Sequence, residues 1–128
     1  MGQPVVHFEI IGEDVATLQA FYYGLFGWRT DRFDTNSPMN YGLVPREENV
    51  LPDGTGIGGG IGQAPEGEPG WVTFYVEVSD VETALAQAER LGGTRLSGPD
   101  EVMDGLVIGH FNDPEGHLIG VATNTAQG

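Results

Sequence analysis

The sequence predicts an α+β fold made of two βαβββ modules with curved mixed sheets around a pocket. Three observations lead to this fold class. The second half of the chain repeats the first. Each repeat opens with a β-rich run and continues with apolar residues at helical spacing. The 21 glycines are spread between short apolar runs, which indicates many turns and short strands. With 128 residues, the chain is long enough for one domain with its own core.

The repeat is found when the sequence is shifted so that residue 4 falls on residue 70. Residues 4–11 then align with residues 70–77, and both stretches are rich in β-branched and aromatic residues. Residues 14–20 align with residues 80–86, with Asp, Val, Thr and Ala at matching places. No gap is needed over this span, so we interpret it as a duplication.

The first module is expected over residues 4–63. After the opening strand, Asp14 is a typical helix N-cap and Gly27 a typical helix stop. Between them, apolar residues recur at helical spacing: Val15, Leu18, Phe21, Tyr22 and Leu25. Three further strands are expected, over 28–33, 39–44 and the glycine-rich run 56–63.

The second module is expected over residues 70–124, after a linker at 64–69 that has two prolines and one glycine. Asp80 is the matching N-cap and 92–93 the glycine stop. The helical positions are Val81, Ala84, Leu85, Ala88 and Leu91. Strands are expected over 94–96, 106–111 and 117–123, with a hairpin turn at 112–116. Phe8 and Phe74 from the strands and Phe21 and Tyr22 from the helix are expected at the interfaces between sheet and helix.

Composition excludes several classes of function. Nineteen acidic residues and only five basic ones, all arginine, give a net charge of −14. Such a chain is not expected to bind nucleic acid. Without lysine or cysteine there is no Schiff base, thiolate nucleophile or disulfide. No segment is long and apolar enough to span a membrane, and the N-terminus lacks a signal-peptide pattern. We therefore expect a soluble cytoplasmic protein without a membrane partner.

Several stretches resemble one known superfamily. They are Val-Val-His-Phe-Glu-Ile, Phe-Tyr-Tyr-Gly-Leu-Phe-Gly-Trp, Val-Glu-Val-Ser-Asp-Val and Asp-Pro-Glu-Gly-His-Leu-Ile-Gly, in that order. The chain resembles the vicinal oxygen chelate superfamily, which contains glyoxalases, bleomycin-resistance proteins and extradiol dioxygenases. The resemblance implies paired βαβββ modules around a small-molecule pocket, often completed by dimerisation, so a homodimer is expected.

The resemblance also implies four metal-ligand positions in the enzymes of the superfamily. They fall on His7, Thr73, Gly120 and a residue within 56–63, a stretch that contains no Asp, Glu or His. A catalytic metal site needs about three protein donors. We expect His110 and His117 to share one sheet face, opposite the face of Gly120, because a tight turn at 113–116 separates them. No metal and no cofactor is therefore predicted.

Three other features of the sequence give weaker indications of function. The run 56–62 matches no phosphate-binding motif, and we interpret its glycines as room for a ligand, as close backbone packing or as a bulged strand. Ser37, Ser79 and Ser97 are expected in turns, and none lies in a nucleophile motif. Glu77 is expected at a solvent-exposed strand end.

The first functional hypothesis is metal-independent sequestration of a largely apolar, aromatic small molecule, as in the antibiotic-resistance proteins of the superfamily. The second is a glyoxalase-like lyase, isomerase or other enzyme with His7 or Glu9 as general base. A third, metal-dependent enzyme would need unexpected ligands. Trp71 is a further aromatic at the start of the second module. The predicted ligand-binding residues are His7, Glu9, Trp28, Phe33, Met39, Tyr41, Gly58, Gly60, Thr73 and Tyr75.

Overall fold

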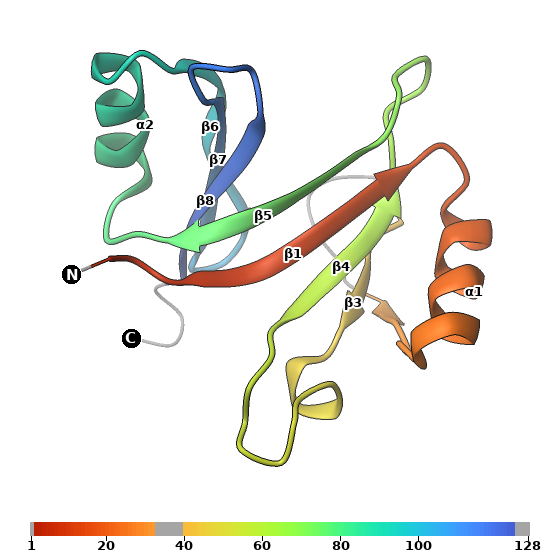
Figure 1. The fold of residues 1–128 in the computed structure, drawn as a ribbon. Helices are drawn as coiled ribbons and strands as arrows, with labels where there is room; N and C mark the ends of the chain where they lie inside the picture. Colours follow the sequence, from red (N-terminus) through yellow and green to blue (C-terminus); the bar gives the residue numbers. More distant parts are fainter. Residues whose placement is uncertain (1, 33–39, 125–128) are drawn as a thin grey trace. The chain divides into compact units, whose positions relative to one another are not determined.

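The computed structural model describes residues 2–32 and 40–124. The chain forms two compact units. One is His7–Val72, and the other combines the N-terminal residues up to Val6 with the chain from Thr73 onward. The elements follow the order β-α-β-β-β twice (Figure 1). The predicted fold class, α+β with two βαβββ modules and mixed sheets, is confirmed.

The first module contains β1 (Val5–Gly12), α1 (Val15–Phe26), β2 (Asp31–Arg32), β3 (Gly42–Val44) and β4 (Gly58–Gln63), with a 3-10 turn at Arg46–Glu48. Its strand order is β2-β3-β4-β1. β1 and β4 are parallel, and the other neighbours are antiparallel. In this register Glu9 lies beside Gly60, and His7 lies beside Gly58.

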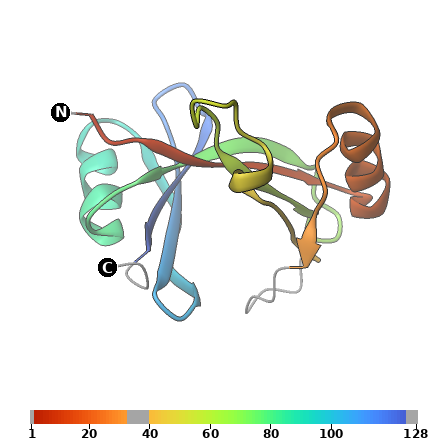
Figure 2. The same cartoon turned by 90° about the horizontal axis from the view of Figure 1, so that it is seen from below.

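The second module contains β5 (Trp71–Glu77), α2 (Val81–Arg90), β6 (Thr94–Met103), β7 (Leu106–Asn112) and β8 (Leu118–Asn124). Its strand order is β5-β8-β7-β6, with β5 and β8 parallel and the others antiparallel. β6 is longer than predicted and includes Ser97, which was expected in a turn. Figure 2 shows these strands from below, with α2 beside them.

The helix ends follow the sequence signals. Asp14 accepts a hydrogen bond from the Thr17 amide, and Asp80 accepts one from the Thr83 amide. Each carboxylate thereby pairs an N–H group that the helix itself leaves unpaired. These hydrogen bonds lower the pKa of both carboxyl groups, the larger part coming from the threonine side chain. Gly27 ends α1 in the left-handed conformation, at φ 74°.

The two helices are buried to different degrees. α2 contributes Val81 and Leu85 to a core that also contains Val78 and Val121. α1 contributes no fully buried residue. Phe21 is 57% exposed, so the prediction that it packs between sheet and helix is wrong. Phe74 is also exposed rather than covered by a helix.

The other two predicted interface aromatics do pack in the first module. The rings of Phe8 and Trp28 lie 4.8 Å apart, and those of Tyr22 and Trp28 lie 5.6 Å apart. Among the described residues, no helix is long and apolar enough to cross a membrane.

Candidate functional site

A hydrogen-bonded cluster of four side chains lies in the compact unit His7–Val72. Glu9 on β1 is 5% exposed. Its Oε1 accepts a hydrogen bond from the Tyr41 hydroxyl at 3.1 Å, and its Oε2 accepts one from Trp71 Nε1 at 2.9 Å. The same tyrosine oxygen lies 2.8 Å from Nε2 of His7. Residues from β1, from the segment before β3 and from the start of β5 are thus joined in one chain of hydrogen bonds.

The hydrogen bonds fix the proton positions in this cluster. The single hydroxyl proton of Tyr41 is donated to Glu9. The hydrogen bond between Tyr41 and His7 must therefore use a proton on Nε2 of the imidazole. In the neutral ring, Nδ1 is then the acceptor nitrogen.

Burial sets the charge of His7. Burial lowers the pKa of the imidazole, and the smaller attraction of the Glu9 carboxylate raises it. The net shift is downward, so the ring is neutral near pH 7. A neutral imidazole can both donate and accept a hydrogen bond, which suits recognition of a phenol, quinone or carbonyl oxygen.

The glycines of β4 make this cluster possible. A Cβ atom on Gly60 would collide with the ring of Tyr41. A Cβ atom on Gly58 would lie 2.6 Å from the carbonyl oxygen of Val44. Close packing by the chain itself therefore occupies the room at these two glycines, one of the interpretations that the sequence left open.

Trp28 lies outside this cluster. Trp28 packs with Phe8, Tyr22 and Phe26, in contact with helix α1. Since Phe8 alternates with His7 and Glu9 along β1, this packing is on the opposite face of the strand. Phe33 and Met39 lie outside the described residues.

The second module holds the other two predicted ligand-binding residues, Thr73 and Tyr75, both buried. The Thr73 hydroxyl donates to the carbonyl oxygen of Leu118 at 2.5 Å. The Tyr75 hydroxyl lies 2.7 Å from Nε2 of His110. On its other side, Nδ1 of His110 lies 3.1 Å from the hydroxyl oxygen of Ser97.

His110 lies on the face of the sheet opposite to the one that the sequence predicts. β7 and β8 pair Asn112 with Leu118, so the connecting loop has one residue more than predicted. Because a shift of one residue turns every side chain to the other face, His110 lies beside Gly120 and shares its face. His117 precedes β8 and contacts the Asp113 carboxylate at 2.9 Å. The predicted placement of His110 was therefore wrong.

The residues present do not fit the metal site that the family implies. Of the implied ligand positions His7, Thr73 and Gly120, only His7 has a metal-binding side chain. The β4 residues beside His7 and Glu9 are glycines. Within residues 2–32 and 40–124, no three His, Asp or Glu side chains are grouped closely enough to hold a metal ion.

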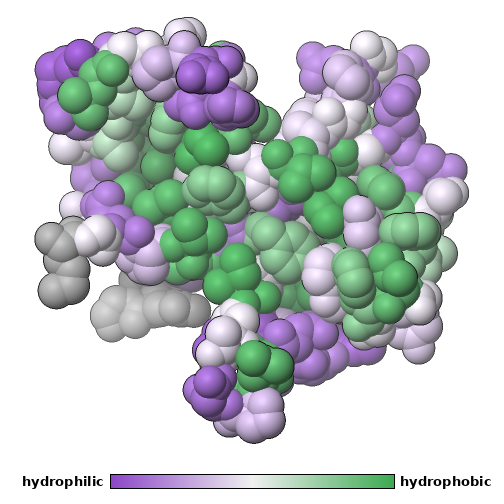
Figure 3. All heavy atoms as spheres, in the orientation of Figure 1, coloured by the Kyte–Doolittle hydropathy of each residue, from purple (hydrophilic) through white to green (hydrophobic). Residues whose placement is uncertain are grey.

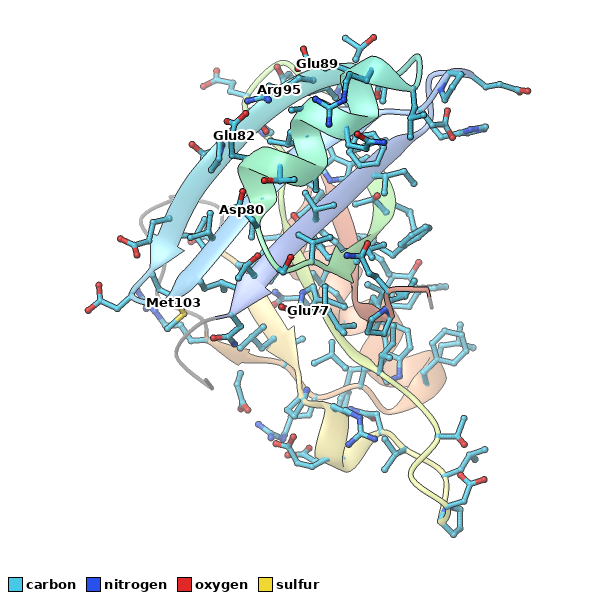
Figure 4. The ribbon with its side chains drawn as sticks, turned by 90° about the vertical axis from the view of Figure 1, so that its left-hand side faces the viewer. Glu77, Asp80, Glu82, Glu89, Arg95 and Met103 are labelled. Carbon is cyan, nitrogen blue, oxygen red and sulfur yellow. The ribbon has the colours of Figure 1, made fainter. Side chains whose placement is uncertain are left out.

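Arg29 and Arg95 form ion pairs with acidic side chains, and Arg46 donates to the carbonyl oxygens of Gly54 and Gly56. Arg29 pairs with Asp31 and Glu48. Arg95 on β6 lies 2.7 Å from Glu82 and 3.4 Å from Glu89 of α2, and Figure 4 shows these three side chains together. Because acidic side chains surround them, Arg29 and Arg95 do not form a basic surface of the kind that binds polyanions.

Sequence reasoning missed three residues of these two clusters: Trp71, Ser97 and His110. Trp71 was noted only as an aromatic, although an indole N–H in a mostly apolar segment needs a polar partner. The predicted positions of Ser97 and His110 depended on the lengths assumed for one strand and one loop. Only the observed register placed them next to each other.

Comparison with known proteins adds two findings. The profile of the glyoxalase-like domain matches residues 7–122. A variant of Streptomyces coelicolor methylmalonyl-CoA epimerase, in complex with 2-nitronate-propionyl-CoA, superposes with a TM-score of 0.70 at 18% identity, covering 97% of this chain and 96% of that one.

Methylmalonyl-CoA epimerase from Mycobacterium tuberculosis superposes with a TM-score of 0.63 at 12% identity, covering 93% of this chain and 86% of that one. At these identities the likeness shows the fold alone. A sequence search of curated proteins finds no significant match.

Proposed function

Because the chain belongs to the glyoxalase-like domain family, we propose that it binds a largely apolar, aromatic small molecule without a metal and holds it unchanged. The proposed binding residues form two sets, each within one compact unit: His7, Glu9, Tyr41 and Trp71 within residues 7–72, and Thr73 and Tyr75 in the unit that contains the chain from Thr73 onward. Aromatic rings with a few fixed polar groups are the usual composition of a small-molecule site.

The observation that carries this proposal is the position of Glu9. Both of its carboxylate oxygens accept hydrogen bonds, from Tyr41 and from Trp71. A carboxylate held in this way orients two aromatic side chains and is less available as a base. The arrangement supports a preorganised binding surface rather than a proton-transfer site.

Charge narrows the class of ligand. The chain has a net charge of −14, and Arg29 and Arg95 are neutralised by their ion pairs. An anionic ligand such as a coenzyme A ester, which the epimerases are described as binding, would be repelled. We therefore infer a neutral or cationic ligand.

A second candidate function is favoured by His7. Its ring is neutral near pH 7 and its Nε2 proton is directed to Tyr41, so Nδ1 has the lone pair of a general base. The methylmalonyl-CoA epimerases of similar fold support this alternative only to the extent that the fold is shared. In it, the protein would remove a proton from a carbon acid.

Native mass spectrometry after incubation with an extract of the source cells tests both functions. Sequestration predicts a metal-free protein that retains an unmodified apolar compound, and weaker retention by Tyr41→Phe and Glu9→Gln. A compound returned chemically altered, with His7→Gln abolishing the change while the compound still binds, would establish the enzyme. Bound stoichiometric metal would contradict both.

We also propose that two copies of the chain associate through α1. The helix has no charged residue (VATLQAFYYGLF), and its Phe21, Tyr23, Leu25 and Phe26 are more than half exposed. Figure 3 shows apolar residues at the surface in this region. Because each copy has a net charge of −14, an uncharged face is where two copies can approach with the least repulsion.

A further inference from the structure

Four residues form a row across the sheet of the second module. The register places Tyr75 beside Gly120, Gly120 beside His110, and His110 beside Ser97. Directly opposed residues on neighbouring strands share a face, so all four lie on one side of the sheet. The row joins β5, β8, β7 and β6.

This side of the sheet is not the one that α2 covers. A Cβ atom on Gly109 would lie 2.8 Å from Leu85 and 2.9 Å from Val81, both on α2. Gly109 therefore faces the helix, and its neighbour His110 faces the other way. Apolar residues of the same strands alternate onto the face of the row, among them Ile108, Leu118 and Ala122.

At one end of the row, Gly120 leaves room for the ring of Tyr75. A Cβ atom on Gly120 would lie 2.5 Å from the ring of Tyr75. The first module has the same arrangement, in which the ring of Tyr41 lies over Gly60 and its hydroxyl is hydrogen-bonded to His7. The aligned positions do not correspond, because His7 aligns with Thr73 and Glu9 with Tyr75. The pairing of tyrosine, glycine and histidine is thus not a simple copy made by the duplication.

The proton order along the row follows from acid strength. A phenol is a stronger hydrogen-bond donor than an aliphatic alcohol, and the Tyr75–His110 hydrogen bond is the shorter one, at 2.7 Å against 3.1 Å. Tyr75 therefore donates to Nε2, and the proton on Nδ1 is donated to the oxygen of Ser97. The hydroxyl proton of Ser97 is then directed out of the row, and each hydrogen bond polarises the next.

We propose that the Ser97 hydroxyl is a recognition point for a small, largely apolar molecule with an oxygen that accepts a hydrogen bond, such as a ketone or a quinone. His110 and Tyr75 are the positioning residues. Ser97 is half-buried, whereas Tyr75 is 5% exposed. Ser97 is therefore more exposed than Tyr75, which lies at the opposite end of the row. The inference shares Tyr75 with the proposed function, but it goes beyond it because it does not depend on the cluster of His7, Glu9, Tyr41 and Trp71.

The tautomer of His110 provides a test that needs no ligand. Nitrogen-15 NMR of the histidine rings should show the Nδ1–H form for His110 and the Nε2–H form for His7. Tyr75→Phe removes the donor to Nε2, so His110 should change to the Nε2–H form. His110→Gln and His117→Gln assign the signals. An Nε2–H form of His110 in the unmodified protein would overturn the proposed proton order.

Acetophenone is the probe for binding, because it is neutral and aromatic and has one carbonyl acceptor. Its infrared carbonyl stretch should move to lower frequency when it binds, as expected for a hydrogen-bonded carbonyl. Ser97→Ala should remove this shift and weaken binding roughly fivefold to tenfold. Tyr75→Phe should also remove it, although Ser97 is still present, because Ser97 then donates to His110. Ser97→Thr should restore the shift.

Ser79→Ala is the matched control, because it removes an exposed serine hydroxyl outside the row. It should leave affinity and shift unchanged. Retention of the shift in Ser97→Ala, or no binding by the unmodified protein at millimolar probe, would overturn the inference. Loss of the shift in Tyr41→Phe but not in Ser97→Ala would place the carbonyl in the first module. That result would overturn this inference and support the proposed function.

Discussion

At the scale of single residues, glycine determines where the aromatic side chains of both modules can lie. Gly60 and Gly120 each lie under a tyrosine ring that a methyl group would displace. In each module the tyrosine hydroxyl then reaches a histidine. The absence of a side chain thus positions the polar groups of both clusters.

Gly60→Ala should be destabilising because its Cβ atom would overlap the ring of Tyr41. Overpacking of this kind costs about 1–3 kcal/mol of unfolding free energy, measured by urea denaturation. Gly24→Ala is the control, since nothing lies within 4 Å of its Cβ position and it is inside α1. It should stabilise the protein by about 0.5–1 kcal/mol. Equal changes in unfolding free energy for the two substitutions would contradict the close packing of Tyr41 against Gly60.

His7 should make stability depend on pH. Its pKa is lowered in the folded protein, so the unfolded chain binds a proton first as the pH falls. The stability due to neutral His7 is complete above its unfolded pKa of about 6.5 and is lost as the pH falls through and below that value. Urea denaturation at pH 7.5 and 5.5 should show this loss, and His7→Gln should reduce it. An unchanged difference in His7→Gln would contradict the burial of His7.

At the scale of elements, the two helices have different surroundings although they come from one duplication. α2 is anchored by Val81 and Leu85 in its core and by the ion pairs of Arg95 with Glu82 and Glu89. α1 has neither a buried residue nor a charge. Its exposed aromatic face is therefore a feature of the first module alone.

The proposed contact between two copies predicts that α1 controls the oligomeric state. Phe21→Glu should shift the protein from dimer to monomer, because it would bring two further negative charges together at the contact. The mass is measured by sedimentation equilibrium or light scattering. Gln87→Glu adds the same charge at an exposed position of α2 and should leave the dimer intact. A monomeric unmodified protein at micromolar concentration would refute the contact.

At the scale of the whole molecule, the excess of carboxylates is the dominant electrostatic feature. With nineteen acidic and five basic residues, most acidic side chains have no arginine to pair with. Mutual repulsion of like charges opposes compaction and is screened by salt.

Stability should therefore increase with ionic strength. The midpoint of thermal unfolding at pH 7 should rise between 10 mM and 200 mM sodium chloride, an interval over which the Debye length falls from about 30 Å to below about 10 Å. The double variant Glu66→Gln and Glu68→Gln removes two exposed charges and should show a smaller rise. A midpoint that is independent of salt would show that self-repulsion is negligible.

The sequence by itself determined the modular fold, because duplication, helix caps and apolar periodicity are local signals. Asp14, Asp80 and Gly27 act as predicted. It also placed His7 and Glu9 on one face of a strand, since alternation along a strand is a local property.

Only the tertiary structure decided which residues meet. Trp71 reaches Glu9 across 62 positions of sequence, and Ser97 meets His110 through the register of β6 and β7. His110 shares a face with Gly120 because of one extra residue in the loop before β8. An error of one residue in the register places every side chain of the strand on the wrong face of the sheet. No local pattern in the loop fixes the length of the loop. The fold therefore follows from short-range preferences, whereas the polar clusters depend on strand register, which is set by packing over the whole module.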